Sequence, residues 1–178
     1  MESVDLTPWR ELQEHLAGYF AARAQGFLAS EFVLSSRSGE EFGRLLVYGP
    51  GGAELETGST RVKIEHTARS RYRILTDGTE TLVAKPARST SGALEVRCGL
   101  LTYDTRLNLL RNTAVARSPE GGEVARIAGG LTNRSYEAIF DVGDEGSLPV
   151  VVFLLYHTLA LRRRAFLTGA KGAETSNS

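Results

Sequence analysis

Four basic residues at alternating positions are the part of this sequence best suited to binding an anion. Arg61 and Lys63 would share one face of a first strand, and Arg71 and Arg73 one face of a second. If the two strands pair as neighbours, these side chains form a basic stripe that could hold a phosphate or an anionic lipid headgroup. The alternative is an ordinary outward strand face whose charge is neutralised by acidic loops.

Residue types that carry out catalysis are scattered along the chain. The three histidines, His15, His66 and His157, do not follow a metal-ligand spacing. The single cysteine, Cys98, alternates with apolar residues toward the expected core, which predicts an inert buried thiol. The sequence therefore predicts a protein that is not an enzyme, with no metal and no cofactor.

A glycine-rich stretch at residues 49–52 invites comparison with a phosphate-binding loop. It is not followed by the Lys and Ser or Thr of such a loop, so it predicts a connection between strands. The glutamates around it are expected to form a solvated, acidic loop surface: Glu40, Glu41, Glu54 and Glu56.

The composition is that of a globular protein and narrows the class of partner. The chain has 178 residues, of which 42% are hydrophobic, with 21 basic and 21 acidic side chains. A general nucleic-acid binder usually carries a basic excess, so this balance argues against that class. One cysteine and an N-terminus without a continuous apolar stretch predict a cytoplasmic protein.

The periodicity of the chain predicts a mainly β fold with a helix at each end. Residues 1–29 are expected to hold an amphipathic helix from Thr7 to Gly26. From Ser30 the period changes to two, with turn signals such as Asp77-Gly78 between short runs. About ten strands are predicted from the candidate runs 31–35, 42–48, 60–66, 71–75, 81–85, 94–98, 100–103, 107–111, 113–117, 123–127 and 135–141.

Residues 148–161 are apolar on every side, so they are expected to be buried whatever their conformation. The run is shorter than the about 20 residues that a membrane span needs, and His157 interrupts it. Pro149 and the arginines 162–164 favour a helix over 148–165, with a strand at 150–153 as the alternative. The β domain would then cover residues 30–166, and a disordered tail 167–178.

The order of a final hairpin, an acidic-glycine turn and an apolar helix, at residues 129–141 and 148–164, carries a resemblance. It resembles the ending of the tubby C-terminal-like superfamily, which includes the LURP-one-related proteins and the phospholipid scramblases. The resemblance implies a closed antiparallel barrel of about 10–12 strands around a hydrophobic C-terminal helix. The N-terminal helix is an addition to that pattern.

The same resemblance implies a non-enzymatic binding or scaffold protein, in the cytoplasm or peripheral to a membrane. It would associate with anionic phospholipid headgroups, or with a protein partner, through its outer surface. The alternative function is an open, lipocalin-like barrel that carries a small hydrophobic ligand. The two differ in whether residues 148–161 fill the barrel as a helix or close it as a strand.

Overall fold

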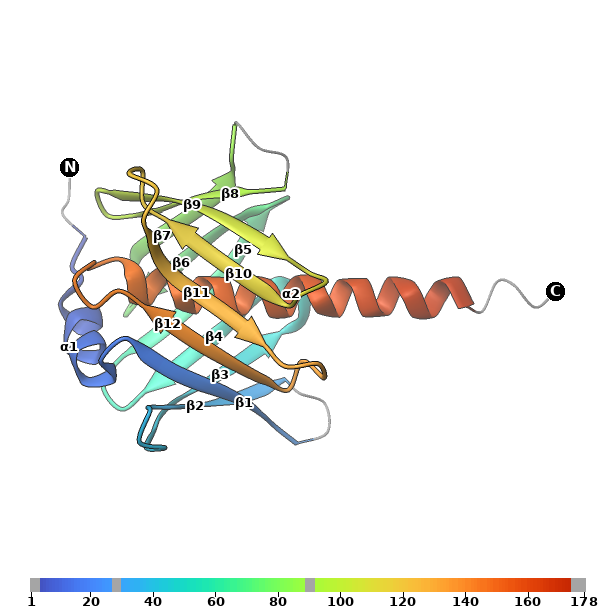
Figure 1. Cartoon of the computed structure of the whole chain (residues 1–178), viewed down its shortest axis with the longest axis horizontal. Coiled ribbons are helices and arrows are strands. Elements are labelled where there is room, and N and C mark those ends of the chain that lie inside the picture. Colours follow the sequence, from blue (N-terminus) through green and yellow to red (C-terminus); the bar gives the residue numbers. More distant parts are fainter. Residues whose placement is uncertain (1–3, 27–29, 89–91, 174–178) are drawn as a thin grey trace.

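Alternation of buried and exposed residues runs through twelve antiparallel strands, which form a closed barrel (Figure 1). The structure is a computed structural model that describes residues 4–26, 30–88 and 92–173. Each strand pairs with its neighbours in the chain, and β1 pairs with β12 to close the barrel. The strands are β1 (Tyr19–Gln25), β2 (Glu31–Ser35), β3 (Glu41–Tyr48), β4 (Gly52–Thr57), β5 (Arg61–Ala68), β6 (Arg71–Thr76), β7 (Thr79–Pro86), β8 (Leu94–Cys98), β9 (Leu101–Asn108), β10 (Thr113–Arg117), β11 (Glu123–Gly129) and β12 (Ser135–Phe140).

The N-terminal helix is shorter than the sequence predicts. Helix α1 spans Thr7–Leu16, and the following residues form β1 rather than a second half of the helix. Ala17 and Gly18 both have positive φ, and a Cβ at Gly18 would lie 2.9 Å from the carbonyl oxygen of Phe140. The helix therefore ends where the chain packs against β12, and the barrel wall begins at Tyr19 instead of residue 30.

Two further strand predictions need correction. The acidic residues predicted as loop after the glycine-rich stretch form β4, and a short 3-10 turn at Gly49–Gly51 connects it to β3. The candidate runs 100–103 and 107–111 are one strand, β9, followed by a turn. The Asp77-Gly78 hairpin is confirmed, because both residues have positive φ between β6 and β7.

The apolar segment is a helix that fills the barrel. Helix α2 spans Ser147–Ala173, and every residue from Gly146 to Ala160 is buried. Figure 1 shows it entering the barrel beside α1 and leaving at the other end along the barrel axis. The helix continues to Ala173, so the tail predicted from 167 is helical over its first residues, while 174–178 lie outside the described residues.

Side-chain size on the inner wall determines where α2 lies. The helix packs most closely on β10, β11 and β12, whose inward residues include several alanines. The wall on the other side carries large inward side chains that fill the wider gap. These are Phe32, Leu34, Leu45, Leu55, Ile64, Tyr72 and Ile74.

Helix α1 closes the end of the barrel at which α2 begins. The Gln13 side-chain amide donates to the carbonyl oxygens of Val142 and Asp144, each at 2.8 Å. Gln13 is buried and these carbonyls belong to the turn before α2, so one side chain fixes the two helices together. Among the described residues, no helix combines the length and apolarity needed to cross a bilayer.

Candidate functional site

The structure places the basic stripe on the outer wall of two paired strands, β5 and β6. Arg61 and Lys63 point outward from β5, and Arg71 and Arg73 outward from β6. The register does not set the four side chains directly opposite one another, because Arg73 faces Glu65 and Arg71 faces Ala68. The four residues therefore share a face without forming a single cluster.

Three members of the basic stripe are engaged in ion pairs with neighbouring carboxylates. Glu65 lies 2.9 Å from Lys63 Nζ and accepts a hydrogen bond of 2.6 Å from Arg73 Nε. The hydrogen bond from Lys63 is the largest cause that lowers the pKa of Glu65 from its usual value, and the hydrogen bond from Arg73 is the second. Arg61 Nη2 lies 3.5 Å from Glu56 Oε1. Anion binding by the stripe stays a prediction, and it would require an anion to compete with these carboxylates.

Strand β4 supplies part of this neutralisation. Its register sets Glu54 opposite Lys63 and Glu56 opposite Arg61. Cross-strand pairs of opposite charge stabilise antiparallel sheets. The glutamates predicted to form a loop surface are thus partly a strand face, and Glu54 and Glu56 belong to the same surface as the basic stripe.

Arg71 is the first residue of β6, so it also lies at the end of the barrel from which α2 emerges. Because the strands run up and down, every second turn lies at this end. By sequence, the turns 26–30, 49–51, 69–70, 87–93, 109–112 and 130–134 contain four arginines and no Asp or Glu. With Arg71 and the arginines of α2 at the exit they form a basic rim: Arg69, Arg71, Arg88, Arg111, Arg134, Arg162, Arg163 and Arg164.

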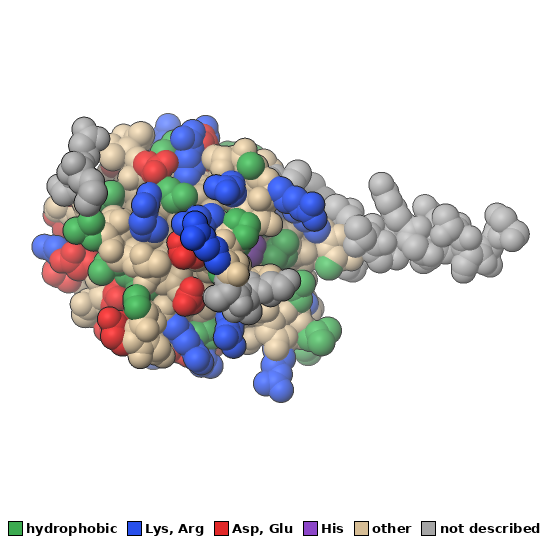
Figure 2. All heavy atoms as spheres, turned by 90° about the horizontal axis from the view of Figure 1, so that it is seen from above, with side chains coloured by type: hydrophobic (Ala, Val, Ile, Leu, Met, Phe, Trp, Pro, Cys, Tyr) green, Lys and Arg blue, Asp and Glu red, His purple; other side chains and the backbone are tan. Residues whose placement is uncertain are grey.

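The basic rim also carries the most exposed large apolar side chains of the described chain. Leu110 is 99% exposed and Leu131 is 100% exposed, at the tips of the β9–β10 and β11–β12 turns. Leu109 and Tyr48 at the same end are partly exposed. On the face seen in Figure 2, the end of the barrel from which α2 emerges carries Lys or Arg side chains and hydrophobic side chains.

The opposite end of the barrel has the reverse charge. Its turns, at residues 36–40, 58–60, 77–78, 99–100, 118–122 and 141–146, contain six carboxylates and one arginine. We call this the acidic end. The carboxylates are Glu40, Asp77, Glu120, Asp141, Asp144 and Glu145. In a chain of zero formal net charge, the turns at the two ends of the barrel therefore carry opposite charge.

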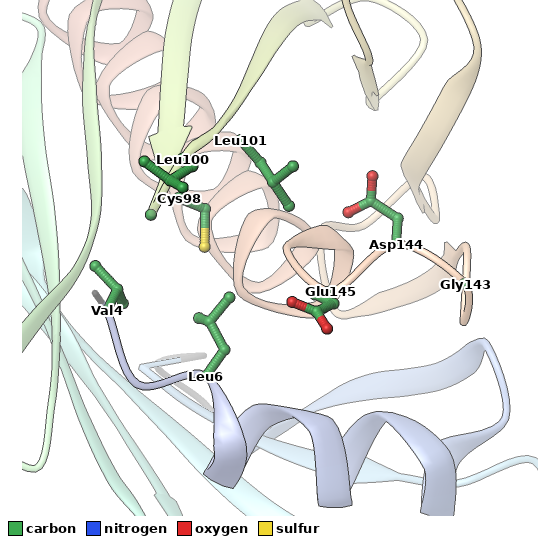
Figure 3. Close-up of a pocket in the computed structure, with 9 residues that line it drawn as sticks. Val4, Leu6, Cys98, Leu100, Leu101, Gly143, Asp144 and Glu145 are labelled. Atoms are coloured by element: carbon green, nitrogen blue, oxygen red, sulfur yellow. The ribbon is translucent and has the colours of Figure 1, made fainter.

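A surface hollow of about 430 Å³ lies at the acidic end, between the segment before α1 and the β8–β9 turn (Figure 3). Val4, Leu6 and Leu101 form its apolar wall, and the carboxylates of Asp144 and Glu145 form its other side. Asp144 accepts a hydrogen bond from the hydroxyl of Tyr103. Burial is the main cause that raises the pKa of the Tyr103 phenol, and this hydrogen bond is the second. The hollow is therefore a depression on the outside of a filled barrel, with a largely apolar lining and two carboxylates at one side.

Burial favours the neutral forms of Cys98 and His157. Burial raises the pKa of Cys98 to about 12, which disfavours a thiolate at neutral pH. Burial likewise lowers the pKa of His157 to about 4. His15 lies on α1, more than half exposed and 3.8 Å from Glu40. Among the described residues, His, Cys, Asp and Glu side chains form no group of three or more that could hold a metal ion.

Comparison with known proteins gives information about the fold. The chain matches no protein-family model and no curated protein. Its structure is similar to an X-ray structure of a protein from Arabidopsis thaliana, AT5G01750, with a TM-score of 0.54. The match covers 78% of this chain and 90% of that one at 15% identity. The likeness is one of fold. It is compatible with the LURP-one-related part of the sequence resemblance.

Sequence reasoning missed the basic rim because its residues are far apart in the chain. Arg69 and Arg134 are separated by half of the barrel strands, β6 to β11. A usable signal was present, since alternate turns of an up-and-down barrel lie at the same end. Sorting the turns by this rule separates the arginines from the carboxylates without coordinates.

Proposed function

We propose that this chain is a non-enzymatic binding protein that docks through its basic rim on an anionic phospholipid surface. The observation that carries the proposal is the segregation of charge, with arginine-bearing turns at one end and acidic turns at the other. The protein would then act as a peripheral membrane protein at a cytoplasmic membrane face.

The electrostatics of the two ends favour one orientation. Each basic residue close to an anionic membrane contributes about 1 kcal/mol at most, and the effect decays within a Debye length. The acidic end is repelled by the same surface, so the rim faces the lipid although the net charge is zero. Arginine suits this role because its planar guanidinium can bind a phosphate with two hydrogen bonds.

The filled barrel supports a function at the outer surface. Helix α2 occupies the space in which an open carrier would hold a hydrophobic ligand. The recurring association with lipid in the tubby-like group, which the sequence resembles, points in the same direction. The neutral, buried states of Cys98 and His157 support a binding protein rather than an enzyme.

Co-sedimentation with vesicles tests the proposal. The full chain is mixed with phosphatidylcholine vesicles, with and without phosphatidylserine, at low and physiological salt. We expect binding that requires phosphatidylserine and weakens with salt. The double variant R71A/R111A removes two exposed arginines of the rim, and R97A/R117A removes two exposed arginines of the wall as a control with the same change in net charge.

The rim variant should lose most of the binding, and the wall variant should keep it. Equal binding by the two variants would refute the role of the rim. Failure of the unmodified chain to bind vesicles that contain phosphatidylserine would refute the lipid proposal, and an acidic protein would then be the partner to seek. A third variant, R73A, tests the basic stripe separately, because Arg73 is paired with Glu65 on the wall.

A further inference from the structure

We infer that Leu110 and Leu131 enter the apolar part of the membrane when the basic rim docks. The barrel axis would then be perpendicular to the membrane plane. The inference rests on the proposed function and adds the mode of attachment. A fully exposed leucine contributes nothing to the core, and two of them occupy the tips of turns at the same end. Exposed apolar residues beside basic ones are typical of membrane-surface contacts.

The two leucine-bearing turns lie side by side. Strand β10 pairs with β11, so the β9–β10 turn and the β11–β12 turn are neighbours around the barrel. Leu110 precedes Arg111, and Leu131 is followed by Arg134 in the same turn. The first tip therefore presents Leu110 next to the exposed Arg111, while Arg134 of the second tip donates from Nη2 to the Gly26 carbonyl at 2.7 Å. An exposed leucine beside a guanidinium matches acyl chains next to phosphates.

A buried asparagine fixes the two turns to one another. The Asn112 side-chain amide donates to the Gly130 carbonyl at 2.9 Å and to Asn133 Oδ1 at 3.2 Å. Asn112 is 4% exposed, and both Asn112 and Asn133 have positive φ, a conformation that asparagine tolerates better than most residues. The leucine tips are thus held in place before any partner arrives.

Packing beneath the turns adds to this rigidity. A Cβ at Gly129 would lie 2.0 Å from Asn112 Nδ2, so glycine is required for the asparagine to reach its partners. Arg162 of α2 donates to the Leu109 carbonyl, which ties the first turn to the helix. Rigid tips lose little conformational entropy on insertion, and this favours binding.

The protruding end of α2 is compatible with this orientation. The helix leaves the rim along the barrel axis and would enter the same leaflet (Figure 1). Residues 165–173 extend about 13 Å at the helical rise and contain one charged residue, Lys171. This length is less than half of the about 30 Å hydrocarbon core, so the segment stays within one leaflet.

Tryptophan substitutions test which end enters the lipid. The chain has a single tryptophan, Trp9, which is 2% exposed at the acidic end and gives a constant background. L110W and L131W place a reporter on each tip, and L100W places one on an exposed position of the acidic end as a control. Each variant is mixed with phosphatidylserine-containing vesicles whose acyl chains are brominated, because bromine quenches tryptophan at the depth of the chains.

Quenching and a blue shift of L110W and L131W, with no change in L100W, are the expected result. Vesicle binding without quenching of the tip variants would overturn the insertion and leave the docking intact. Loss of vesicle binding in the unmodified chain would overturn both. Spectral changes of L110W and L100W together, without vesicles, would show head-to-tail association of rim and acidic end and would also overturn the inference.

Serine substitutions give a second measurement that does not depend on a new aromatic ring. We expect L110S and L131S each to weaken vesicle binding about tenfold, because part of a leucine side chain is no longer transferred from water. The control L100S should bind as the unmodified chain does. Since Leu110 and Leu131 are fully exposed, thermal unfolding of the variants should be unchanged. Equal binding by L110S, L131S and L100S would refute insertion.

Discussion

Trp9 of α1 donates a hydrogen bond from its indole nitrogen to Thr76 Oγ1 of β6 at 2.9 Å, and both side chains are buried. Thr81 of β7 donates to the same oxygen at 2.7 Å. The Thr76 hydroxyl thus joins the capping helix to the turn between β6 and β7. It is the acceptor for two donors that are buried away from water.

Replacing Thr76 with valine is therefore expected to destabilise the fold. T76V keeps the shape of the side chain but leaves two buried donors without their acceptor, at a cost of about 1–3 kcal/mol. Urea unfolding followed by circular dichroism measures the loss. The control T79V changes an exposed threonine of the same hairpin and should alter the free energy of unfolding little. Equal effects of the two variants would contradict this role of Thr76.

Removal of α2 is expected to prevent folding. A chain that stops at Gly146 lacks the helix whose residues through Ala160 are buried, so the barrel would enclose a large empty space. Gel filtration and circular dichroism should show an unfolded or aggregated product. A chain that stops at Ala165 keeps the buried part and should fold. A folded, soluble product ending at Gly146 would refute the role of α2 as the core of the barrel.

His157 makes stability depend on pH in the acidic range. Its ring packs on Phe153 and Tyr72, and burial, with smaller contributions from Arg164 and His66, lowers its pKa to about 4. In the unfolded chain the pKa of His157 is about 6.5. Between pH 4 and pH 6.5 the unfolded chain therefore binds a proton at His157 that the folded chain does not. The contribution of His157 to the free energy of unfolding is therefore fully present above about pH 6.5, and it is lost as the pH falls toward 4.

The expected loss attributable to His157 is about 2 kcal/mol between pH 7 and pH 5. Urea unfolding at a series of pH values measures it. H157F retains an aromatic ring against Phe153 and removes the titrating group, so its stability should vary less over this range. An unchanged pH dependence in H157F would show that other groups cause it.

Cys98 is expected to be unreactive in the folded protein. Burial, with a smaller contribution from Asp144, raises its pKa to about 12, and its exposed fraction is 0% although it adjoins the hollow in Figure 3. An aromatic disulfide reagent at neutral pH should label the thiol after denaturation and leave the native chain unlabelled. Labelling of the native chain at the rate of the denatured chain would contradict the buried position.

Local sequence could not assign β1, although it assigned most of the barrel. Phe20 follows Leu12 and Leu16 at a spacing that suits a helix, and its inward position on β1 suits a strand equally well. The choice depends on β2 and β12, which would both be open edges if β1 did not lie between them. That requirement is non-local, so no short window of sequence contains it.

The strand β4 illustrates a different difficulty. Glu54 and Glu56 follow a glycine-rich turn and read as loop surface when taken alone. Their role becomes visible through the register, which sets them opposite Lys63 and Arg61 of β5. The basic stripe could be predicted from alternation. Its neutralisation could not, because the glutamates of β4 resemble loop residues in the sequence.

By itself, the sequence determined the elements and the burial of the central helix. Alternation sets which strand residues face inward, and an apolar surface on all sides requires that residues 148–161 be enclosed. Tertiary structure decided which charges act together. The arginines of the basic rim are distributed over five separate parts of the chain, and the closure of the barrel brings them to the end opposite most of the turn carboxylates. Strand pairing between distant residues creates that surface, so it exists only in the folded protein.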